Sequence, residues 1–473
     1  MEKNRAISLF LCLCLLLQVF VFTGFAQEAE ADESVINGSH SIDAQKPLLG
    51  SGQLITNSES VLLYDMNSQT MIYAFNPDLR YSPASLVKIM TCWVAVENGN
   101  LEDQVTVNGA LISGLENDTV KIGLKDGEVV TVKDLLYCMM VGSANDASII
   151  LANHISGNER TFVSLMNEYA QRAGCQDTNF TNCSGYHDEM QYTTARDLAK
   201  IIDMALENET FKEIFGADYY AVEATNLSEK RHISTNNYLM NVDSFDVYYD
   251  SRVTGGRSGI TSTDMGCVAV TAKKGNLEVI SILLGASSAY EENGYTIKSY
   301  GGFPETSDLL DIGLTGYRRT QIIADGQVFM QCPVVNGESD VVLGTNISVS
   351  TVLPEAVDES DLVFRYFDVD SEFRAPIEKG TKLSYVEIWY QGICLATADL
   401  YAMNAVPVMY EKLYEPTPPN WLDVVLSVLW KVILFAAGVF VIYLIAVRVF
   451  GRFRKVSARN RARRNRMNRR RSR

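Results

Sequence analysis

The feature that most constrains this chain is an apolar segment near its C-terminus. Val432 to Val447 carries no charged residue, and together with residues 424–430 it is long enough to cross a bilayer core of about 30 Å. Beyond it, Arg452 to Arg473 holds twelve Lys or Arg residues and no acid. Because positive flanks stay inside the cell, we expect a lipid-embedded transmembrane helix over 424–450, a basic cytoplasmic tail over 451–473, and residues 27–420 outside the cell membrane.

The N-terminus carries a second membrane signal. Lys3 and Arg5 precede an apolar run from Ala6 to Phe22, and small residues stand at Gly24 and Ala26. This order predicts a signal peptide over residues 1–26, with an uncleaved anchor as the alternative. Residues 27–54 are acidic and rich in Ser, Gly and Asn, which predicts a flexible lead-in.

Charge and cysteine usage exclude some classes of function. The formal net charge is −16, and removing the tail's +12 leaves −28, so we expect no nucleic-acid partner. Seven cysteines remain after the signal peptide, with no C-x-x-C pair, which argues against a metal site or a complete disulfide framework. Cys175 and Cys183 flank a loop and could form a bridge. We expect no metal and no cofactor.

Hydrophobic patterning divides the outside part into two domains, over residues 55–300 and 301–412. In the first, helices are predicted over Ser82–Glu97, Val132–Met140, Asp146–Ile155, Thr161–Ala173 and Thr194–Glu207. Strands are predicted over Glu59–Tyr64, Met71–Phe75, Asp246–Ile260, Gly266–Ala272 and Leu277–Gly285. Strands at both ends of a helical interior indicate an α+β sheet whose first and last strands meet. A helix over Ser307–Tyr317 then leads to a small all-β region over Thr320–Val406.

Ser85 and Lys88 form the first of three polar motifs. They are three residues apart on a predicted helix and therefore share one face. A lysine kept neutral by burial or by a nearby cation can take the proton of a serine nucleophile. The spacing is common by chance, and an ordinary capped surface helix would also show it.

The other two motifs supply partners for that serine. Ser143 and Asn145 lie in a predicted turn between helices, which can present a hydroxyl and an amide to a cleft, although a helix cap would show the same pattern. Arg257-Ser258-Gly259 lies on a predicted strand, where glycine allows close approach and arginine can anchor a carboxylate. Together these residues suit acyl transfer from a peptide that ends in a free carboxylate.

On these residues the chain resembles the serine-type D-alanyl-D-alanine carboxypeptidases, the low-molecular-mass penicillin-binding proteins. S-x-x-K and S-x-N match the family's motifs, and its K-T-G is approximated. Further similar stretches are SPASLVKIMT at 82–91, YTTARDLA at 192–199 and APIEKG at 375–380. The resemblance implies a penicillin-binding or β-lactamase-like transpeptidase domain, an antiparallel sheet flanked by helices, followed by a small all-β domain and the membrane helix.

The resemblance also implies roles. Ser85 would attack the carbonyl between two terminal D-alanines of a peptidoglycan stem pentapeptide, with Lys88 as base. Ser143 would relay a proton to the leaving amine, and Asn145 would hold Lys88 and a substrate amide. The backbone N–H groups of Ser85 and Ile260 would form the oxyanion hole. Penicillin and other β-lactams would trap the same serine.

Two stretches depart from the family pattern. Arg257, Ser258 and Gly259 stand where the family has K-T-G, so positive charge and hydroxyl are kept, but arginine is longer and cannot lose its proton. Asn182-Cys183-Ser184-Gly185-Tyr186 stands where the family usually has Asn-Pro-His-Gly-Leu.

Three other functions share part of this pattern. A class A β-lactamase shares S-x-x-K and needs a glutamate for deacylation, for which Asp188 and Glu189 are in the right region but lack the surrounding pattern. A Ser-His-Asp hydrolase is disfavoured because no motif surrounds any histidine: His40, His154, His187 and His232. A catalytically weak receptor or scaffold for cell-wall peptides is the alternative from another class, suggested by Arg257 and the basic tail.

Overall fold

The computed structural model describes residues 46–49, 54, 56–116, 119–242, 247–263, 265–290, 297–369, 372–409 and 420–470. The predicted signal peptide lies outside these described residues, as does most of the lead-in. The chain divides into two compact units, the first of residues 1–331, 342–371 and 380–403 and the second of residues 332–341, 372–379 and 404–473.

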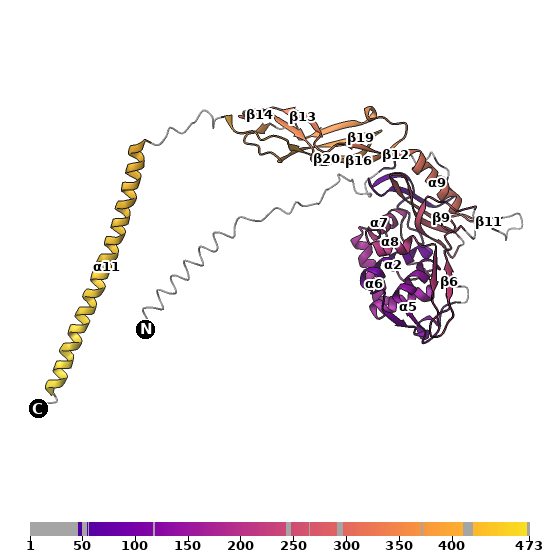
Figure 1. Cartoon of the computed structure of the whole chain (residues 1–473), viewed down its shortest axis with the longest axis horizontal. Helices are drawn as coiled ribbons and strands as arrows, with labels where there is room; N and C mark the ends of the chain where they lie inside the picture. Colours follow the sequence, from indigo (N-terminus) through magenta and orange to yellow (C-terminus); the bar gives the residue numbers. More distant parts are fainter. Residues whose placement is uncertain are drawn as a thin grey trace. The chain divides into compact units, whose positions relative to one another are not determined.

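A five-stranded antiparallel sheet organises the N-terminal part of the first unit (Figure 1). Its strand order is β2 (Thr70–Phe75), β1 (Ser60–Asp65), β9 (Leu277–Ala286), β8 (Gly266–Lys274) and β7 (Val253–Ile260). Leu63 of β1 lies opposite Ser281 of β9, so the first and last strands of the domain meet, as predicted. Strand β7 is left at the edge, where a peptide can approach its free side.

Helices cover both faces of this sheet. One face packs against the helices α2 (Val87–Asn98), α4 (Val132–Met140), α5 (Asn145–Ser156), α6 (Glu159–Arg172), α7 (Ala195–Ala205) and α8 (Glu209–Phe215). The other face packs Leu63 and Leu283 against Leu310 and Leu314 of α9 (Phe303–Thr315). Strand β8 is buried from Gly266 to Ala272 because both of its faces are covered, which explains its continuous apolar run.

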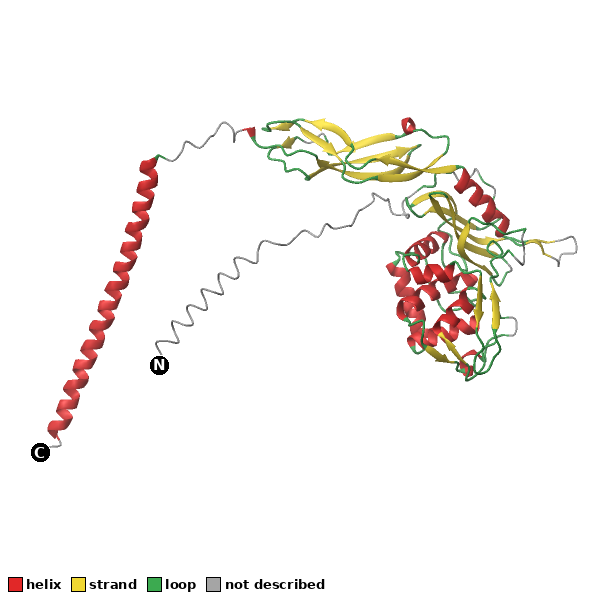
Figure 2. Cartoon of the chain, in the orientation of Figure 1, coloured by secondary structure: helices red, strands yellow, loops and turns green. Residues whose placement is uncertain are grey.

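Shorter elements complete this part. They are the 3-10 turn η1 (Ala84–Leu86), β3 (Gln104–Thr106), α3 (Gly109–Ile112), β4 (Val129–Thr131), β5 (Tyr219–Val222), β6 (Arg231–Ser234), β10 (Ala289–Tyr290) and β11 (Ile297–Ser299). Figure 2 shows helices gathered in the part that contains the first sheet, and a separate region made of strands, which lies between α9 and α11 in the chain.

The region after α9 is built of strands, as predicted. β12 (Tyr317–Ile323) pairs with β16 (Val349–Pro354). A second five-stranded sheet has the order β13 (Val328–Cys332), β15 (Val341–Gly344), β20 (Ile393–Ala402), β19 (Lys382–Tyr390) and β17 (Val363–Phe367), with the turn η2 (Glu359–Asp361) before its last strand. Every second residue from Ser384 to Tyr390 is buried, the period expected of a strand with one face on a core.

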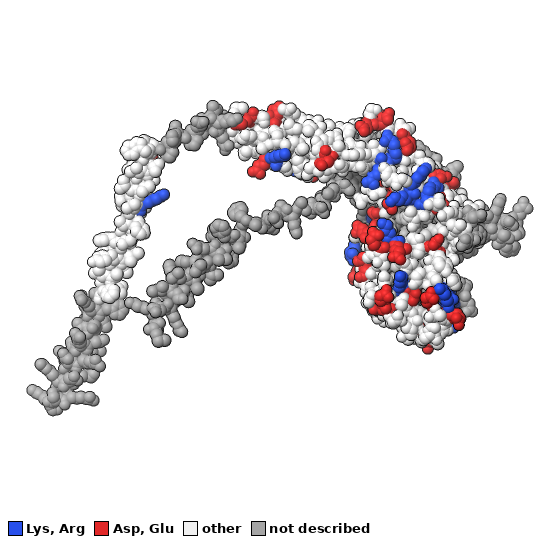
Figure 3. Space-filling view, viewed as in Figure 1, with Lys and Arg blue, Asp and Glu red and all other residues white. Residues whose placement is uncertain are grey.

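The second unit contains the C-terminal helix. Strand β14 (Val334–Val335) pairs in parallel with β18 (Phe373–Arg374), and α11 runs over Trp421–Arg470. Within the described part of the chain, Trp421–Phe450 is the one helical stretch long and apolar enough to span a membrane, and none of it is buried. In Figure 3 its described surface is almost free of charge, whereas acidic and basic residues are mixed over the visible face of the part built around the first sheet.

The structure corrects some predicted boundaries. Strand β7 begins at Val253 rather than Asp246, because residues 247–252 turn around Asp250, whose carboxylate accepts from the Arg252 backbone N–H at 3.0 Å. Residues 243–246 lie outside the described part. Helix α8 and the β5–β6 hairpin were not predicted from the sequence. Asn208 is nevertheless a signal for the start of α8, because its side-chain oxygen accepts from the backbone N–H groups of Thr210 and Phe211.

The capping box of α4 generates a stability prediction. The Thr131 hydroxyl accepts from the Asp134 N–H at 3.0 Å, and the Asp134 carboxylate accepts from the Thr131 N–H at 3.0 Å. We expect Thr131→Ala to lower the free energy of unfolding by about 1 kcal/mol, because one helix N–H loses its partner. Thermal unfolding followed by circular dichroism measures it. Thr131→Ser keeps the acceptor and should stay near wild type; equal losses in both variants would contradict the capping role.

Candidate active site

Ser85 lies at a crowded turn where strand β7, a loop and the start of α2 converge. The preceding residue, Ala84, has a left-handed backbone with φ +47°. A Cβ on Gly259 would come within 2.8 Å of the Ser85 nitrogen, and one on Gly185 would collide with the Ala84 carbonyl oxygen. Glycine at these two positions therefore lets the strand and the loop close around the serine backbone.

Lys88 lies one helical turn after Ser85 and is completely buried. Its Nζ is 3.4 Å from Ser85 Oγ and donates a hydrogen bond to the carbonyl oxygen of Ser184. Burial, reinforced by the positive charge of Arg257, holds the pKa of Lys88 well below its usual range. A neutral amine at this distance can accept the serine proton.

Ser143 approaches the same oxygen from the turn between α4 and α5. Its Oγ donates to Ser85 Oγ at 3.2 Å, and its backbone is left-handed with φ +59°. A left-handed backbone costs a residue other than glycine on the order of 1–3 kcal/mol. It persists only where the surrounding structure imposes it, often at active sites. The structure thus brings Ser85 and Lys88 together with Ser143 from a second segment of the chain.

Asn145 and Asp146 begin helix α5 behind this turn. The Asn145 N–H donates to the Val120 carbonyl at 2.9 Å, while Asn145 Oδ1 is buried without a hydrogen-bond partner among the described residues. The buried Asp146 carboxylate accepts from the backbone N–H groups of Ile122 at 3.2 Å, Gly123 at 3.0 Å and Leu124 at 3.1 Å. Asp146 therefore fixes the loop at 120–124 against α5. Sequence reasoning treated it only as a helix start.

Arg257 is buried under the site, with 1% of its surface exposed. Its Nη1 donates to the carbonyl oxygen of Met140 at the end of α4, and its Nε and Nη2 are buried without partners within the described part of the chain. Burial lowers the pKa of Arg257 to about 10, so the guanidinium stays charged at neutral pH. It is not among the residues that line the cavity at Ser85.

A cavity of about 250 Å³ opens beside the nucleophile. Its walls include Ser85, Ser143, Ser258, Gly259 and Ile260. Ser258 Oγ donates to the backbone oxygen of Asn236 at 3.1 Å, and Ile260, at the end of β7, is 59% exposed. The predicted strand motif thus borders the same cavity as the predicted serines.

The divergent loop after α6 holds Lys88 through its backbone. Asn182 Oδ1 accepts from the N–H of Ser184 at 3.2 Å and of Gly185 at 2.7 Å, forming a local turn that aims the Ser184 carbonyl at Lys88. Sequence reasoning did not identify Ser184, whose side chain carries no signal for this contact. Cys183 Sγ donates to Glu159 Oε1 at 3.1 Å. Cys175 and Cys183 are not joined by a disulfide, which contradicts the possible bridge between them.

Among the described residues, those that the competing hydrolases would need do not line the cavity. His40 lies outside the described part of the chain. Neither Asp188 nor Glu189 is among the described residues that line the cavity, and Asp188 Oδ1 instead accepts from the Met190 N–H at 2.8 Å. His154 Nε2 lies 3.7 Å from Asp103 Oδ2, and His232 Nδ1 contacts the Tyr219 hydroxyl.

Comparison with known proteins covers both domains. Residues 49–288 match the model of the D-alanyl-D-alanine carboxypeptidase family, and residues 317–408 match the model of the penicillin-binding protein 5 C-terminal domain.

Individual relatives agree with these matches. The D-alanyl-D-alanine carboxypeptidase DacA of Haemophilus influenzae is 31% identical over 359 residues, which cover 74% of this chain and 85% of that protein. DacF of Bacillus subtilis, a D-alanyl-D-alanine carboxypeptidase, is 27% identical over 358 residues, which cover 74% of this chain and 86% of that protein. A crystal structure of penicillin binding protein 5 from Haemophilus influenzae superposes with a TM-score of 0.61 at 29% identity, covering 76% of this chain and 100% of that one. The predicted fold is confirmed.

The hydrogen bonds of Asp146 to the loop at 120–124 predict that substituting Asp146 lowers stability and loosens the rim of the cavity. We expect Asp146→Ala to lower the free energy of unfolding by about 2–3 kcal/mol, because several buried N–H groups lose a charged acceptor. Limited proteolysis should cut the variant faster within the loop at 120–124.

Asp146→Asn is the matched control, since its amide oxygen can still accept from part of the loop. It should fall between wild type and Asp146→Ala in thermal unfolding. An alanine variant as stable as wild type would show that the loop does not depend on this carboxylate.

Proposed function

The chain belongs to the D-alanyl-D-alanine carboxypeptidase family, and we propose that Ser85 is the nucleophile with which it removes the terminal D-alanine from peptidoglycan stem pentapeptides. Membership of the family confirms the predicted serine-type carboxypeptidase activity in peptidoglycan metabolism. The observation that carries the assignment of Ser85 is its position, 3.4 Å from the amine of a fully buried lysine and 3.2 Å from a second hydroxyl.

Acylation begins when neutral Lys88 accepts the Ser85 proton. Ser85 Oγ then bonds to the carbonyl carbon between the two terminal D-alanines, and the backbone N–H groups of Ser85 and Ile260 stabilise the oxyanion. Ser143 passes the proton that Lys88 accepted to the amine nitrogen as the C–N bond breaks, so Lys88 is neutral again and D-alanine leaves as a neutral amine. Water then hydrolyses the ester and restores the Ser85 hydroxyl.

The remaining site residues bind and orient the substrate. The Asn145 amide holds Lys88 and a substrate amide, a role that its unpartnered Oδ1 supports. Arg257 acts through its charge from beneath the cavity, attracting the terminal carboxylate while keeping Lys88 neutral. Ser258 and Gly259 border the cavity, where the missing side chain at Gly259 leaves room for the peptide backbone.

The same chemistry accounts for inhibition by β-lactams. Penicillin presents an amide carbonyl and a carboxylate in one rigid molecule, and its acyl-enzyme on Ser85 is released slowly. The helix Trp421–Phe450 anchors the enzyme in the cell membrane, and the twelve positive residues beyond it remain in the cytoplasm, so the catalytic part works on the cell-wall side.

Substitution of the nucleophile provides the direct test. We expect Ser85→Ala to abolish labelling by fluorescent penicillin and to reduce release of D-alanine from a stem pentapeptide by more than about 10³-fold, because the covalent step is lost. Gel fluorescence and chromatography of the released amino acid measure the two effects.

Ser113→Ala, on the surface after α3, is the matched control and should behave as wild type. Penicillin labelling of wild type without D-alanine release would favour a binding receptor, and rapid penicillin turnover would favour a β-lactamase. Labelling that survives in Ser85→Ala would exclude Ser85 as the nucleophile.

Arg257 predicts a pH effect with a definite sign. Lys88 acts as a base only when neutral, so activity rises as the pH passes upward through the pKa of Lys88. Arg257→Met removes the neighbouring cation, which raises that pKa. The acidic limb of the kcat/KM profile for D-alanine release should therefore move to higher pH.

Arg257→Lys is the control because it keeps a cation at the same strand position. Its acidic limb should lie closer to wild type than that of Arg257→Met. Coincident profiles for wild type and Arg257→Met would show that Arg257 does not tune Lys88.

A further inference from the structure

The loop over residues 182–186 is held by contacts that the mechanism above does not use. Cys183 stands in this loop where the family usually has proline, a residue without a backbone N–H. Here the N–H is present, and it belongs to a residue that is completely buried. Because a buried N–H needs an acceptor, another part of the chain has to supply one.

Glu159 supplies that acceptor from the first position of helix α6. Its Oε1 accepts from the Cys183 backbone N–H at 3.1 Å and from the Cys183 thiol, also at 3.1 Å. A charged carboxylate forms stronger hydrogen bonds than a neutral acceptor does. The N–H of Cys183 is therefore fixed to α6.

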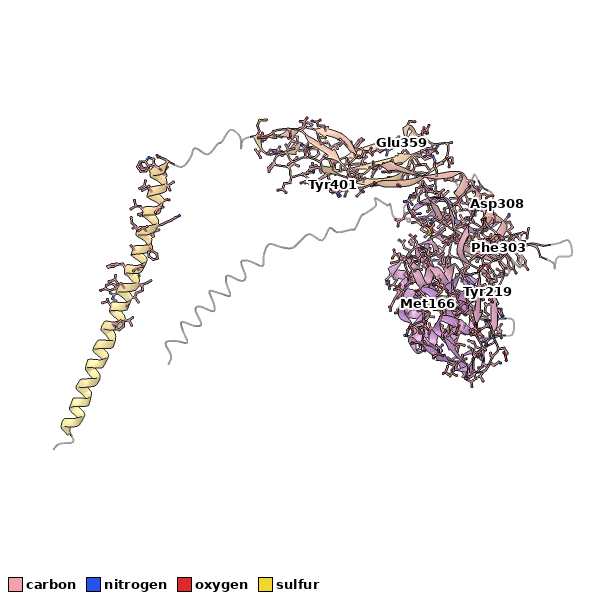
Figure 4. All side chains as sticks on the ribbon, viewed as in Figure 1. Met166, Tyr219, Phe303, Asp308, Glu359 and Tyr401 are labelled. Carbon is pink, nitrogen blue, oxygen red and sulfur yellow. The ribbon has the colours of Figure 1, made fainter. Side chains whose placement is uncertain are left out.

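Thr91 holds the same residue from helix α2. Its Oγ1 donates to the Cys183 carbonyl oxygen at 2.7 Å and lies 3.9 Å from Sδ of Met166, which is labelled in Figure 4 and belongs to α6. Thr91 is buried and follows Lys88 by three residues, as Lys88 follows Ser85, so it continues their i, i+3 row. One helix thus binds Cys183 at its N–H, and another binds it at its carbonyl.

These two contacts fix the backbone one residue before the group that holds Lys88. The Ser184 carbonyl oxygen accepts from Lys88 Nζ, and that Nζ lies 3.4 Å from Ser85 Oγ. Hydrogen bonds from nitrogen to oxygen mostly span about 2.7–3.2 Å, so this approach is already long. A shift of a few tenths of an ångström in the Ser184 carbonyl would let the amine move out of reach of the serine proton.

We propose that Glu159 and Thr91 are positioning residues for Lys88. They hold the backbone of Cys183, and the next carbonyl along the chain keeps the lysine amine within reach of Ser85 Oγ. The inference rests on the proposed function, in which Lys88 takes the serine proton. Neither Glu159 nor Thr91 is among the described residues that line the cavity, so substitutions at either should slow proton transfer and leave peptide binding intact.

Acylation rates of the full-length protein in detergent test the proposal. The measurements are the second-order rate constant for labelling by fluorescent penicillin and kcat/KM for D-alanine release from a stem pentapeptide. We expect Glu159→Ala to lower both by about 10- to 100-fold, because a base displaced by a fraction of an ångström transfers protons poorly. Thr91→Val keeps the shape of the side chain, loses its hydroxyl, and should lower both by about tenfold.

Peptide binding without chemistry separates positioning from a general loss of structure. In the Ser85→Ala background no acyl-enzyme forms, so titration followed by nuclear magnetic resonance gives the Kd of the stem pentapeptide directly. Adding Glu159→Ala or Thr91→Val to that background should change this Kd by less than about twofold. A residue that only maintains the shape of the cavity would instead weaken binding by as much as it slows acylation.

Three variants provide matched controls. Glu159→Gln keeps a side-chain oxygen for the Cys183 N–H, and Thr91→Ser keeps the hydroxyl, so each should retain acylation within about threefold of wild type. Glu168→Ala removes an exposed carboxylate farther along α6 and should behave as wild type. Thermal unfolding shows which variants are folded at the assay temperature.

The outcomes separate this inference from the function on which it rests. Wild-type acylation rates in Glu159→Ala and Thr91→Val overturn the inference alone, as does a Kd that rises in proportion to the loss of acylation. If Glu159→Ala does not fold, Thr91→Val and Thr91→Ser decide the question, and equal rates in these two overturn the inference. Wild type that neither binds penicillin nor releases D-alanine overturns both proposals.

Discussion

The site depends on the enclosure of two cationic side chains in one small volume. Lys88 and Arg257 are both buried, and the charge of one opposes protonation of the other. A guanidinium holds its proton more tightly than an amine, so the lysine becomes the neutral partner. The serine can then be activated without a histidine, and the Ser184 carbonyl keeps the amine in place as a hydrogen-bond acceptor.

The fold maintains this arrangement by bringing backbone segments unusually close. Gly259 and Gly185 allow a strand edge and a loop to lie against the turn at Ser85, where side chains would collide. Left-handed residues on two segments, Ala84 and Ser143, aim both serines at the same point. The surrounding sheet and the Asp146 anchor hold these conformations, so the geometry exists before a substrate arrives.

Local patterns in the sequence predicted much of this architecture. The hydrophobic patterning, with strands at both ends of a helical interior, led to the right sheet and to most of its helices. The i, i+3 spacing placed Lys88 beside Ser85. The burial of Arg257 could not be predicted, because the neighbouring glycines hide the alternation that shows which way a strand residue faces. Ser85 and Ser143 meet only through folding, because they are 58 residues apart in the chain.

The buried position of Arg257 has a consequence for the solution conditions under which the enzyme works. Mobile ions screen charges at a protein surface over about 10 Å at 0.1 M ionic strength, but they do not enter a packed interior. In the proposed function, the attraction between this guanidinium and an anionic peptide would pass through protein rather than through electrolyte. Peptide binding in that function should therefore vary little with salt concentration.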